Sequence, residues 1–364
     1  MTTPDGAGRR DERGTAVQRA RAALVVGLAA ILGRLPTAFV GGVSDALGEL
    51  WYRLAPDRAA IARGNLAHVA AWLAAEGRGS ARARAAASDP AALERLVRAA
   101  FRHGVRTYAE TLRAGATARD VRRGLVIESP EAVDAAFAAG GPIIFATLHF
   151  GSMMGVSTVL SDRIRVPITA PMETLGDPEL QRVLRRAREG GGARIVDLRE
   201  ARRELRAALG RGEGVGLVAD RDIAGGGVPV TLFGQPASLP IGPAYLAIDT
   251  GAPLHVAATR RVARDRFRGW LVTLPHPPAD LPRRARIEAL LQAEARAFED
   301  LVAPAPEQWW SVFYPIWKGV GPRPRGAAAA PPLAAGSAAP VGAVPPAAVG
   351  ANRPGPEPVR EPRP

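Results

Sequence analysis

The chain lacks cysteine altogether, and among its 364 residues only Lys318 is a lysine. Without cysteine there are no disulfides, no thiolate metal sites and no cysteine nucleophiles. Aromatic residues make up only 5% of the chain, and the sequence shows no zinc-ligand spacing, basic zipper or other nucleic-acid module. These absences predict that nucleic acid is not a partner.

Long apolar runs are also missing. The longest uncharged piece near the start, 22–33, has 12 residues, whereas a bilayer-spanning helix needs about 20. The surrounding stretch, residues 16–54, is apolar with interspersed arginines, which is typical of helices that lie in a membrane interface. In this interpretation the arginines face lipid phosphates, while Leu, Val and Trp51 enter the acyl boundary. The alternative is that the same helices pack on the protein core.

The charge that is present is strongly basic. The formal net charge is +13, and nearly all of the positive charge is arginine, so the chain calls for an anionic partner such as an anionic membrane surface or a phosphorylated substrate. Hydrophobic residues make up 47%, enough for one large core or two small ones. We predict a disordered leader (1–15), a folded part (16–320) and a disordered Pro/Ala-rich tail (321–364).

Within the folded part, membrane-associating helices (16–54) and a helical part (55–120) are predicted to precede an α/β part (121–320). From residue 121 onward, short strands alternate with helices. This alternation predicts an α/β fold with a mostly parallel central sheet and helices on both faces.

The stretch from Pro142 to Gly155 holds the main candidate residue. An apolar run of strand-forming residues ends in His149, Phe150 and Gly151. In α/β folds a buried strand delivers side chains to the crevice at its carboxyl end. We interpret His149 as the catalytic base.

A second block, Asp220-Arg221-Asp222, follows a later buried strand and is expected in the same crevice. Asp220 and Arg221 could instead pair and cap a loop. Further along, Gly242 opens a helix whose free backbone N–H groups are a ready seat for a phosphate or an oxyanion. Four more arginines are candidates for holding a phosphate: Arg185, Arg186, Arg188 and Arg194. The remaining histidines are interpreted as structural or exposed: His68, His103, His255 and His276.

Taken in order, these motifs resemble the lysophospholipid acyltransferase superfamily, in the branch that holds lipid A biosynthesis acyltransferases and actinobacterial phosphatidylinositol mannoside acyltransferases. The resemblance covers roughly residues 20 to 320. It rests on the following segments: Thr147 to Ser152, similar to the branch's His-x-Gly-Asn-Trp-acid motif; Asp220-Arg221-Asp222; Val230 to Gly234, expected to be a strand that ends in Phe-Gly; Leu239 to Ala244 with Ala247; Gly251-Ala252-Pro253; and Gln308-Trp309-Trp310 with Trp317.

The resemblance implies a glycerolipid acyltransferase-like fold and transfer of an acyl group from a coenzyme A or acyl-carrier-protein thioester to a hydroxyl of a phospholipid or glycolipid. No metal or redox cofactor is implied. The enzyme would act peripherally on the cytoplasmic face of the cell (inner) membrane. Substrate-binding residues carried over in this way are Gly151, Ser152, Arg221, Asp222 and Gly242.

The sequence departs from this pattern at Met154, where the family has an acid. Such a carboxylate fixes the tautomer of the histidine and stabilises the imidazolium, and methionine cannot do this. Three explanations follow. Another carboxylate pairs with His149, first Asp220 and second Glu173; or the chain is a catalytically impaired relative that binds lipid or acyl carrier; or His149 works without an acid.

Overall fold

The computed structural model describes residues 14–138, 140–163, 166–189, 192–222, 225–317 and 319. Most of the predicted leader and the whole predicted tail therefore lie outside the described residues. Thr15, assigned to the leader, is the N-cap of the first helix, where its side chain accepts a hydrogen bond from the Gln18 backbone N–H. The described residues belong to one unit, which ends at Pro322.

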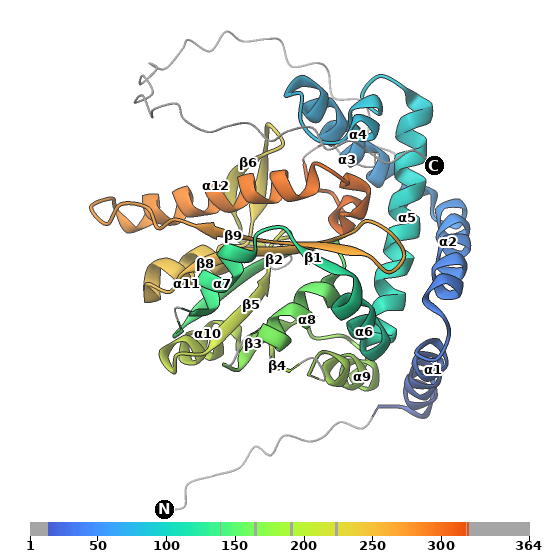
Figure 1. Cartoon of the computed structure of the whole chain (residues 1–364), viewed down its shortest axis with the longest axis horizontal. Coiled ribbons are helices and arrows are strands. Elements are labelled where there is room, and N and C mark those ends of the chain that lie inside the picture. Colours follow the sequence, from blue (N-terminus) through green and yellow to red (C-terminus); the bar gives the residue numbers. More distant parts are fainter. Residues whose placement is uncertain are drawn as a thin grey trace, which may run out of the picture. The chain divides into compact units, whose positions relative to one another are not determined.

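Helices occupy most of the first 124 residues and then alternate with strands (Figure 1). Their bounds are α1 (Ala16–Leu32), α2 (Thr37–Leu54), α3 (Pro56–Ala75), α4 (Ala81–Ala85), α5 (Pro90–Leu112), α6 (Ala114–Gly124), α7 (Pro130–Ala138), α8 (Met153–Arg163), α9 (Pro178–Glu189), α10 (Ala201–Gly210), α11 (Gly242–Thr250) and α12 (Arg283–Val302), followed by the 3-10 helices η1 (Pro306–Gln308) and η2 (Trp310–Phe313).

A seven-stranded sheet with the order β1-β9-β8-β2-β5-β3-β4 forms the centre of the fold. The strands are β1 (Leu125–Ile127), β2 (Ile143–Gly151), β3 (Ile168–Met172), β4 (Ala193–Asp197), β5 (Gly214–Val218), β8 (Leu254–Arg261) and β9 (Phe267–Leu274). All neighbours pair in parallel except β8 and β9, which are antiparallel. The predicted α/β class and mostly parallel sheet are confirmed.

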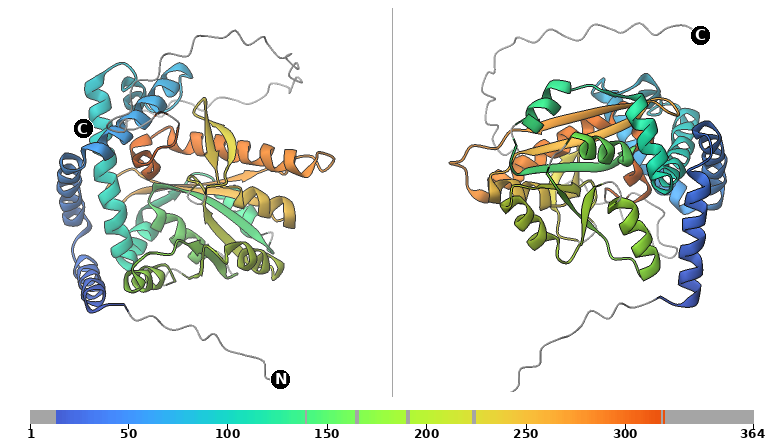
Figure 2. Two further views of the ribbon diagram at one scale, coloured as in Figure 1. Left: turned by 180° about the vertical axis from the view of Figure 1, so that it is seen from behind. Right: turned by 60° about the horizontal axis from the view of Figure 1, so that its bottom comes forward.

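Strand β2 shows why the sheet is covered on both faces. Alternate side chains of a strand point to opposite faces, and here both sets are apolar. One set, Ile144, Ala146, Leu148 and Phe150, joins the large core that includes α3, α5, α11 and α12. The other set, Ile143 and Phe145, joins a smaller core with α7 and α8. Figure 2 shows helices on either side of the sheet.

A two-stranded hairpin, β6 (Val228–Leu232) and β7 (Gln235–Leu239), stands apart from the main sheet. The sequence predicted one strand over residues 230–234, which is wrong at its end, because the chain reverses at Phe233-Gly234. Both turn residues have positive φ, 48° and 73°, as the tightest hairpin turns require. Phenylalanine is an unusual choice there, and its ring is completely buried, so burial offsets the backbone strain.

The first two helices carry most of the exposed apolar side chains. Of the 17 exposed large hydrophobic residues in the described part of the chain, ten lie on α1 and α2: Val17, Leu24, Val26, Leu28, Ile31, Phe39, Val43, Leu47, Leu50 and Leu54. Within the described ranges, none of the helices has the length and apolar character needed to cross a membrane. Trp51 was expected in the acyl boundary. It packs instead against Phe101 and Phe313, with ring centroids 4.6 and 5.0 Å away.

Candidate active site

His149 and Asp220 are brought together by the register of two neighbouring parallel strands. Thr147 of β2 lies opposite Val218 of β5, so the residues two positions further along each strand also lie side by side. The Nδ1 atom of His149 lies 2.7 Å from Oδ1 of Asp220, and the His149 backbone N–H donates to Oδ2 at 3.1 Å. The two strand-end residues that the sequence singled out therefore form a direct pair.

The carboxylate of Asp220 is buried and fully hydrogen-bonded. Besides His149, the Trp309 indole N–H and the Ser311 hydroxyl donate to its Oδ2 at 2.8 and 2.6 Å. Burial by itself would raise the pKa of this carboxyl. The charge of His149 and the hydrogen bonds from His149, Ser311 and Trp309 outweigh burial and hold the pKa below its usual value. Asp220 is therefore an anion facing the imidazole.

This geometry fixes how the imidazole is used. Because Nδ1 faces an anionic oxygen, Nδ1 carries the proton and Nε2 is left as the acceptor. The His149 side chain is 24% exposed, whereas that of Asp220 is fully buried. The imidazole of the pair is thus partly accessible, whereas the carboxylate is not.

The other two positions considered for an acid lie elsewhere. Glu173 follows β3, which is separated from β2 by β5 in the sheet, and the described contacts include none between its exposed side chain and His149. Met154 lies in the first turn of α8, where its backbone carbonyl accepts a hydrogen bond from the Thr158 hydroxyl. The structure therefore pairs the histidine with the first candidate, Asp220, and not with the second, Glu173.

The turn after the histidine is held against strand β8. Gly151 has φ +55°, and a Cβ there would lie 1.8 Å from the Thr259 carbonyl oxygen, so only glycine fits. The next backbone N–H, of Ser152, donates to that same oxygen at 2.9 Å. In turn, the Ser152 side chain accepts from the Gly155 N–H at 3.2 Å and so caps α8. Both residues act here in holding the turn.

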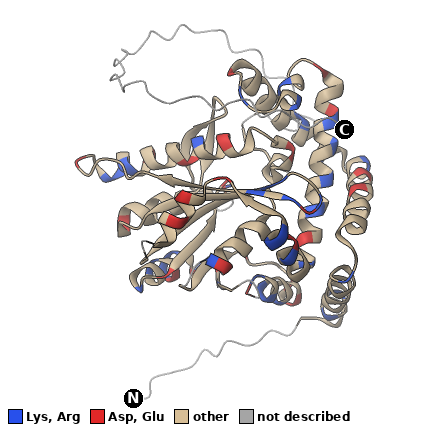
Figure 3. Cartoon of the chain, viewed as in Figure 1, with Lys and Arg blue, Asp and Glu red and all other residues tan. Residues whose placement is uncertain are grey.

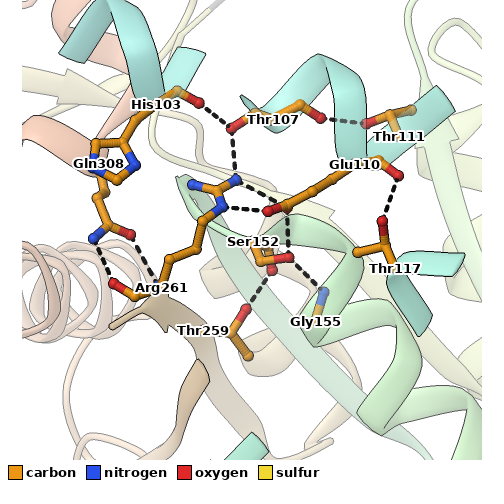
Figure 4. Close-up of polar contacts among 10 residues, drawn as sticks. All are labelled: His103, Thr107, Glu110, Thr111, Thr117, Ser152, Gly155, Thr259, Arg261 and Gln308. Carbon is orange, nitrogen blue, oxygen red and sulfur yellow. Dashed lines mark hydrogen bonds and ion pairs between the residues drawn. The ribbon is translucent and has the colours of Figure 1, made fainter. Parts of the chain in front are cut away.

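A buried ion pair supports this turn from the side of α5 (Figure 4). The Ser152 hydroxyl donates to the Glu110 carboxylate at 2.7 Å, and the same carboxylate forms an ion pair with Arg261, whose side chain is 3% exposed. Arg261 also donates to the Thr107 hydroxyl at 2.9 Å. Its backbone is held by the Gln308 amide, which accepts from Arg261 N–H and donates to its carbonyl. Sequence reasoning did not single out Glu110 or Arg261, because nothing local links positions 110, 152 and 261.

Asp222 and Gly242 serve local structure in the described contacts. The Asp222 carboxylate accepts hydrogen bonds from the backbone N–H groups of Gly225, Gly226 and Gly227 at 2.8–3.1 Å, so it closes the glycine loop. Gly242 is the first residue of α11, and a Cβ there would lie 3.2 Å from a Leu217 methyl carbon. The predicted roles of Asp222 and Gly242 in substrate binding stay predictions.

The arginines predicted to hold a phosphate divide into two groups. Arg185 and Arg194 form ion pairs with Asp197 and Glu204 at 2.7 and 2.6 Å, and Arg188 lies close enough to Glu173 to feel its charge, so these charges are partly compensated. Arg221 differs, because its guanidinium stacks on the Tyr314 ring, 3.6 Å from the centroid. Figure 3 shows that basic and acidic segments are interspersed over the helices, as the ion pairs of Arg185 and Arg194 illustrate.

The other histidines have structural surroundings. Burial lowers the pKa of His255 to about 4, and its Nδ1 lies 3.0 Å from the Thr273 hydroxyl. His68 and His276 contact the backbone carbonyls of Phe233 and Ala252. Burial, together with nearby arginines, places the pKa of His103 well below its usual value. These contacts agree with the structural interpretation of these residues.

Two further buried acids were not anticipated. Glu294 of α12 is completely buried, and burial plus the neighbouring Asp220 charge raise its pKa well above the usual value. Burial also raises the pKa of Glu307 in η1. Among the described residues, no group of three or more His, Asp or Glu side chains is arranged to hold a metal ion. The expectation that no cofactor is needed stays a prediction.

Comparison with known proteins places this geometry in context. A family model described as bacterial lipid A biosynthesis acyltransferase matches residues 10–318. A phosphatidylinositol mannoside acyltransferase of Mycobacterium tuberculosis is 31% identical over 199 residues, which is 53% of this chain and 60% of that protein. A protein of the same name from Mycolicibacterium smegmatis is 29% identical over 236 residues, covering 61% of this chain and 72% of the relative.

Proposed function

The chain belongs to the bacterial lipid A biosynthesis acyltransferase family, and from this premise we propose that it is a membrane-associated O-acyltransferase. It moves a fatty acyl group from a coenzyme A or acyl-carrier-protein thioester to a hydroxyl of a phospholipid or glycolipid. The observation that carries the proposal is the His149–Asp220 pair, in which Nδ1 of the imidazole faces an anion and Nε2 has no hydrogen-bond partner among the described residues. The pair supports this proposal over the alternative of an impaired binding protein, because Asp220 supplies a carboxylate that the methionine at position 154 cannot.

In the proposed reaction His149 is the general base. Its Nε2 takes the proton of the acceptor hydroxyl while the oxygen attacks the thioester carbonyl carbon. Asp220 holds the proton on Nδ1 and stabilises the imidazolium that forms. When the tetrahedral intermediate collapses, the C–S bond breaks, and the imidazolium returns its proton to the departing thiolate. The acyl ester and the free thiol are the products.

We place the enzyme peripherally on the cytoplasmic face of the cell membrane. Helices α1 and α2 supply the support for this, because they expose ten large apolar side chains. A helix face of this kind binds the boundary between lipid headgroups and acyl chains. The net charge of +13 adds attraction to anionic lipid. Half-buried Trp51 fixes α2 to the core, while the apolar side chains that α2 exposes, such as Leu47 and Leu50, stay available to the membrane.

The reaction is tested by an acyl-transfer assay with a long-chain acyl thioester and membrane lipid extract as acceptor. We expect His149→Ala to abolish transfer and Asp220→Asn to lower the rate by about 10⁴-fold, the loss seen when the equivalent acid of a serine hydrolase becomes an amide. Thioester binding should be retained in both variants.

Glu173→Gln is the matched control, because Glu173 was the alternative acid and lies one strand further from the histidine. Its rate should stay within a few-fold of the unsubstituted protein. Full activity of Asp220→Asn would contradict the proposed role of the pair. Fatty-acid release without an acylated acceptor would identify a hydrolase instead.

A further inference from the structure

A cluster of two arginines stacked on one tyrosine adjoins the His149–Asp220 pair. Arg221 directly follows Asp220 and lies 3.6 Å from the Tyr314 ring centroid; Arg58, in the first turn of α3, lies 4.8 Å from the same centroid. Tyr314 follows η2, whose Ser311 binds Asp220. Three segments far apart in the sequence thus converge beside the catalytic carboxylate.

The two guanidinium groups are left without acidic partners in the described part of the chain. The Arg221 side chain forms no hydrogen bond or ion pair there, and its one described contact is the stack on Tyr314. Arg58 donates only to the Phe313 carbonyl, at 2.8 Å. Many other arginines of this chain pair with a carboxylate, as Arg185 does with Asp197. Two adjacent uncompensated charges repel each other, so the arrangement favours a bound anion.

Stacking also prepares these groups for a particular kind of anion. A guanidinium lying face-on against an aromatic ring keeps its N–H groups in its own plane, pointing outward. These N–H groups match two oxygens of a phosphate at once. The side chains are accessible, since Arg58 is exposed and Arg221 and Tyr314 are half-buried. Tyr108 lies close enough to feel both arginine charges and brings a further hydroxyl to the cluster.

We propose that Arg58, Arg221 and Tyr314 form a phosphate-binding site that anchors a phosphate-bearing substrate beside His149. This inference rests on the proposed function, and it adds where the charged part of a substrate is held. Its chemistry is that of a phosphate ester, which both the coenzyme of an acyl thioester and a phospholipid acceptor carry.

Titration calorimetry on the full chain tests the site with two probes, coenzyme A and a soluble short-chain phosphatidylinositol. We expect Arg221→Ala and Arg58→Ala each to weaken binding of one probe by about tenfold, as loss of a charged hydrogen-bonding partner does. Loss of coenzyme A binding would assign the site to the donor, and loss of phospholipid binding would assign it to the acceptor. Arg221→Lys should recover only part of the affinity, because it keeps the charge without the planar fork.

Arg202→Ala is the matched control, since Arg202 stacks on another tyrosine, Tyr245, at 5.8 Å. This variant should bind both probes with unchanged affinity. Circular dichroism establishes that each variant is folded. Unchanged affinity for both probes in Arg58→Ala and Arg221→Ala, or no binding of either probe by the unsubstituted protein, would overturn the site. His149→Ala should still bind the probe, so a failure of the acyl-transfer proposal is distinguishable from a failure of this one.

Discussion

At the scale of single residues, the central finding is that the histidine has its carboxylate without the acid of the usual motif. The motif that this chain resembles has an acid five residues after the histidine, and here that position is Met154, in the first turn of α8. Asp220 reaches the imidazole from the neighbouring strand instead. Its second oxygen is occupied by Trp309 and Ser311, which leaves it little freedom to move away from His149.

Restoring an acid at position 154 is therefore expected to bring little gain. Nδ1 of His149 already has an anionic partner, and a second carboxylate nearby would add repulsion between like charges. We expect Met154→Asp to change the acyl-transfer rate by less than about tenfold, in either direction. Met154→Asn, of similar size and uncharged, is the control that isolates the charge. A gain of several hundredfold in Met154→Asp alone would show that Asp220 does not serve the histidine.

At the scale of structural elements, the strand end that carries His149 is fixed by groups from α5 and β8. Glu110 of α5 holds both the N-cap serine of α8 and Arg261 of β8. The ion pair is buried, and a buried charge that loses its partner is costly. The Glu110–Arg261 pair thus ties the catalytic turn to the helical part of the chain.

Glu110→Gln should destabilise the fold strongly. It leaves the Arg261 guanidinium buried without an anion, for which we expect a loss of about 3–5 kcal/mol in the free energy of unfolding, measured by urea denaturation. Glu288→Gln breaks an exposed pair between Glu288 and Arg284 and should cost at most about 1 kcal/mol. Equal, small losses in the two variants would show that the buried pair is not important for stability.

At the scale of the whole molecule, two features occur together. Most of the exposed large apolar side chains of the described residues lie on α1 and α2, and the chain as a whole is strongly basic. Helix α2 lies along α5 and α1 contacts α9 (Figure 1), so the helices are attached to the α/β part and still expose their outer sides. Apolar side chains supply the depth of membrane binding and arginines supply the preference for anionic lipid. Both contributions belong to the proposed membrane association.

Charged substitutions on α2 test this association. Leu47 and Leu50 are 49% and 48% exposed, so Leu47→Glu and Leu50→Glu should fold normally and weaken binding to phosphatidylglycerol vesicles by about tenfold or more, as measured by co-sedimentation. Leu281→Glu is the control, because Leu281 is similarly exposed, at 40%, but lies before α12. Equal binding by all three variants and the unsubstituted protein would contradict a membrane role for α2.

The amino-acid sequence by itself determined the local structure and the candidate residues. The alternation of strands and helices predicted the α/β class, and the apolar runs placed His149 and Asp220 at the ends of buried strands. The sequence could not predict the turn at Phe233-Gly234, because its first position is Phe in place of the usual Asn, Asp or Gly, and the positive φ of Phe233 depends on burial in the core. Local sequence carries no record of such distant contacts.

Only the tertiary structure decided which acid meets the histidine. Asp220 and Glu173 both follow strands of the same parallel sheet, and both were candidates on that ground. Strand β5 is the neighbour of β2, whereas β3 lies on the far side of β5. Since adjacent strands are about 4.8 Å apart, Asp220 starts from the strand next to the histidine, whereas Glu173 starts about twice as far away. Strand order depends on how all the helices pack over the sheet, so it is a property of the whole fold.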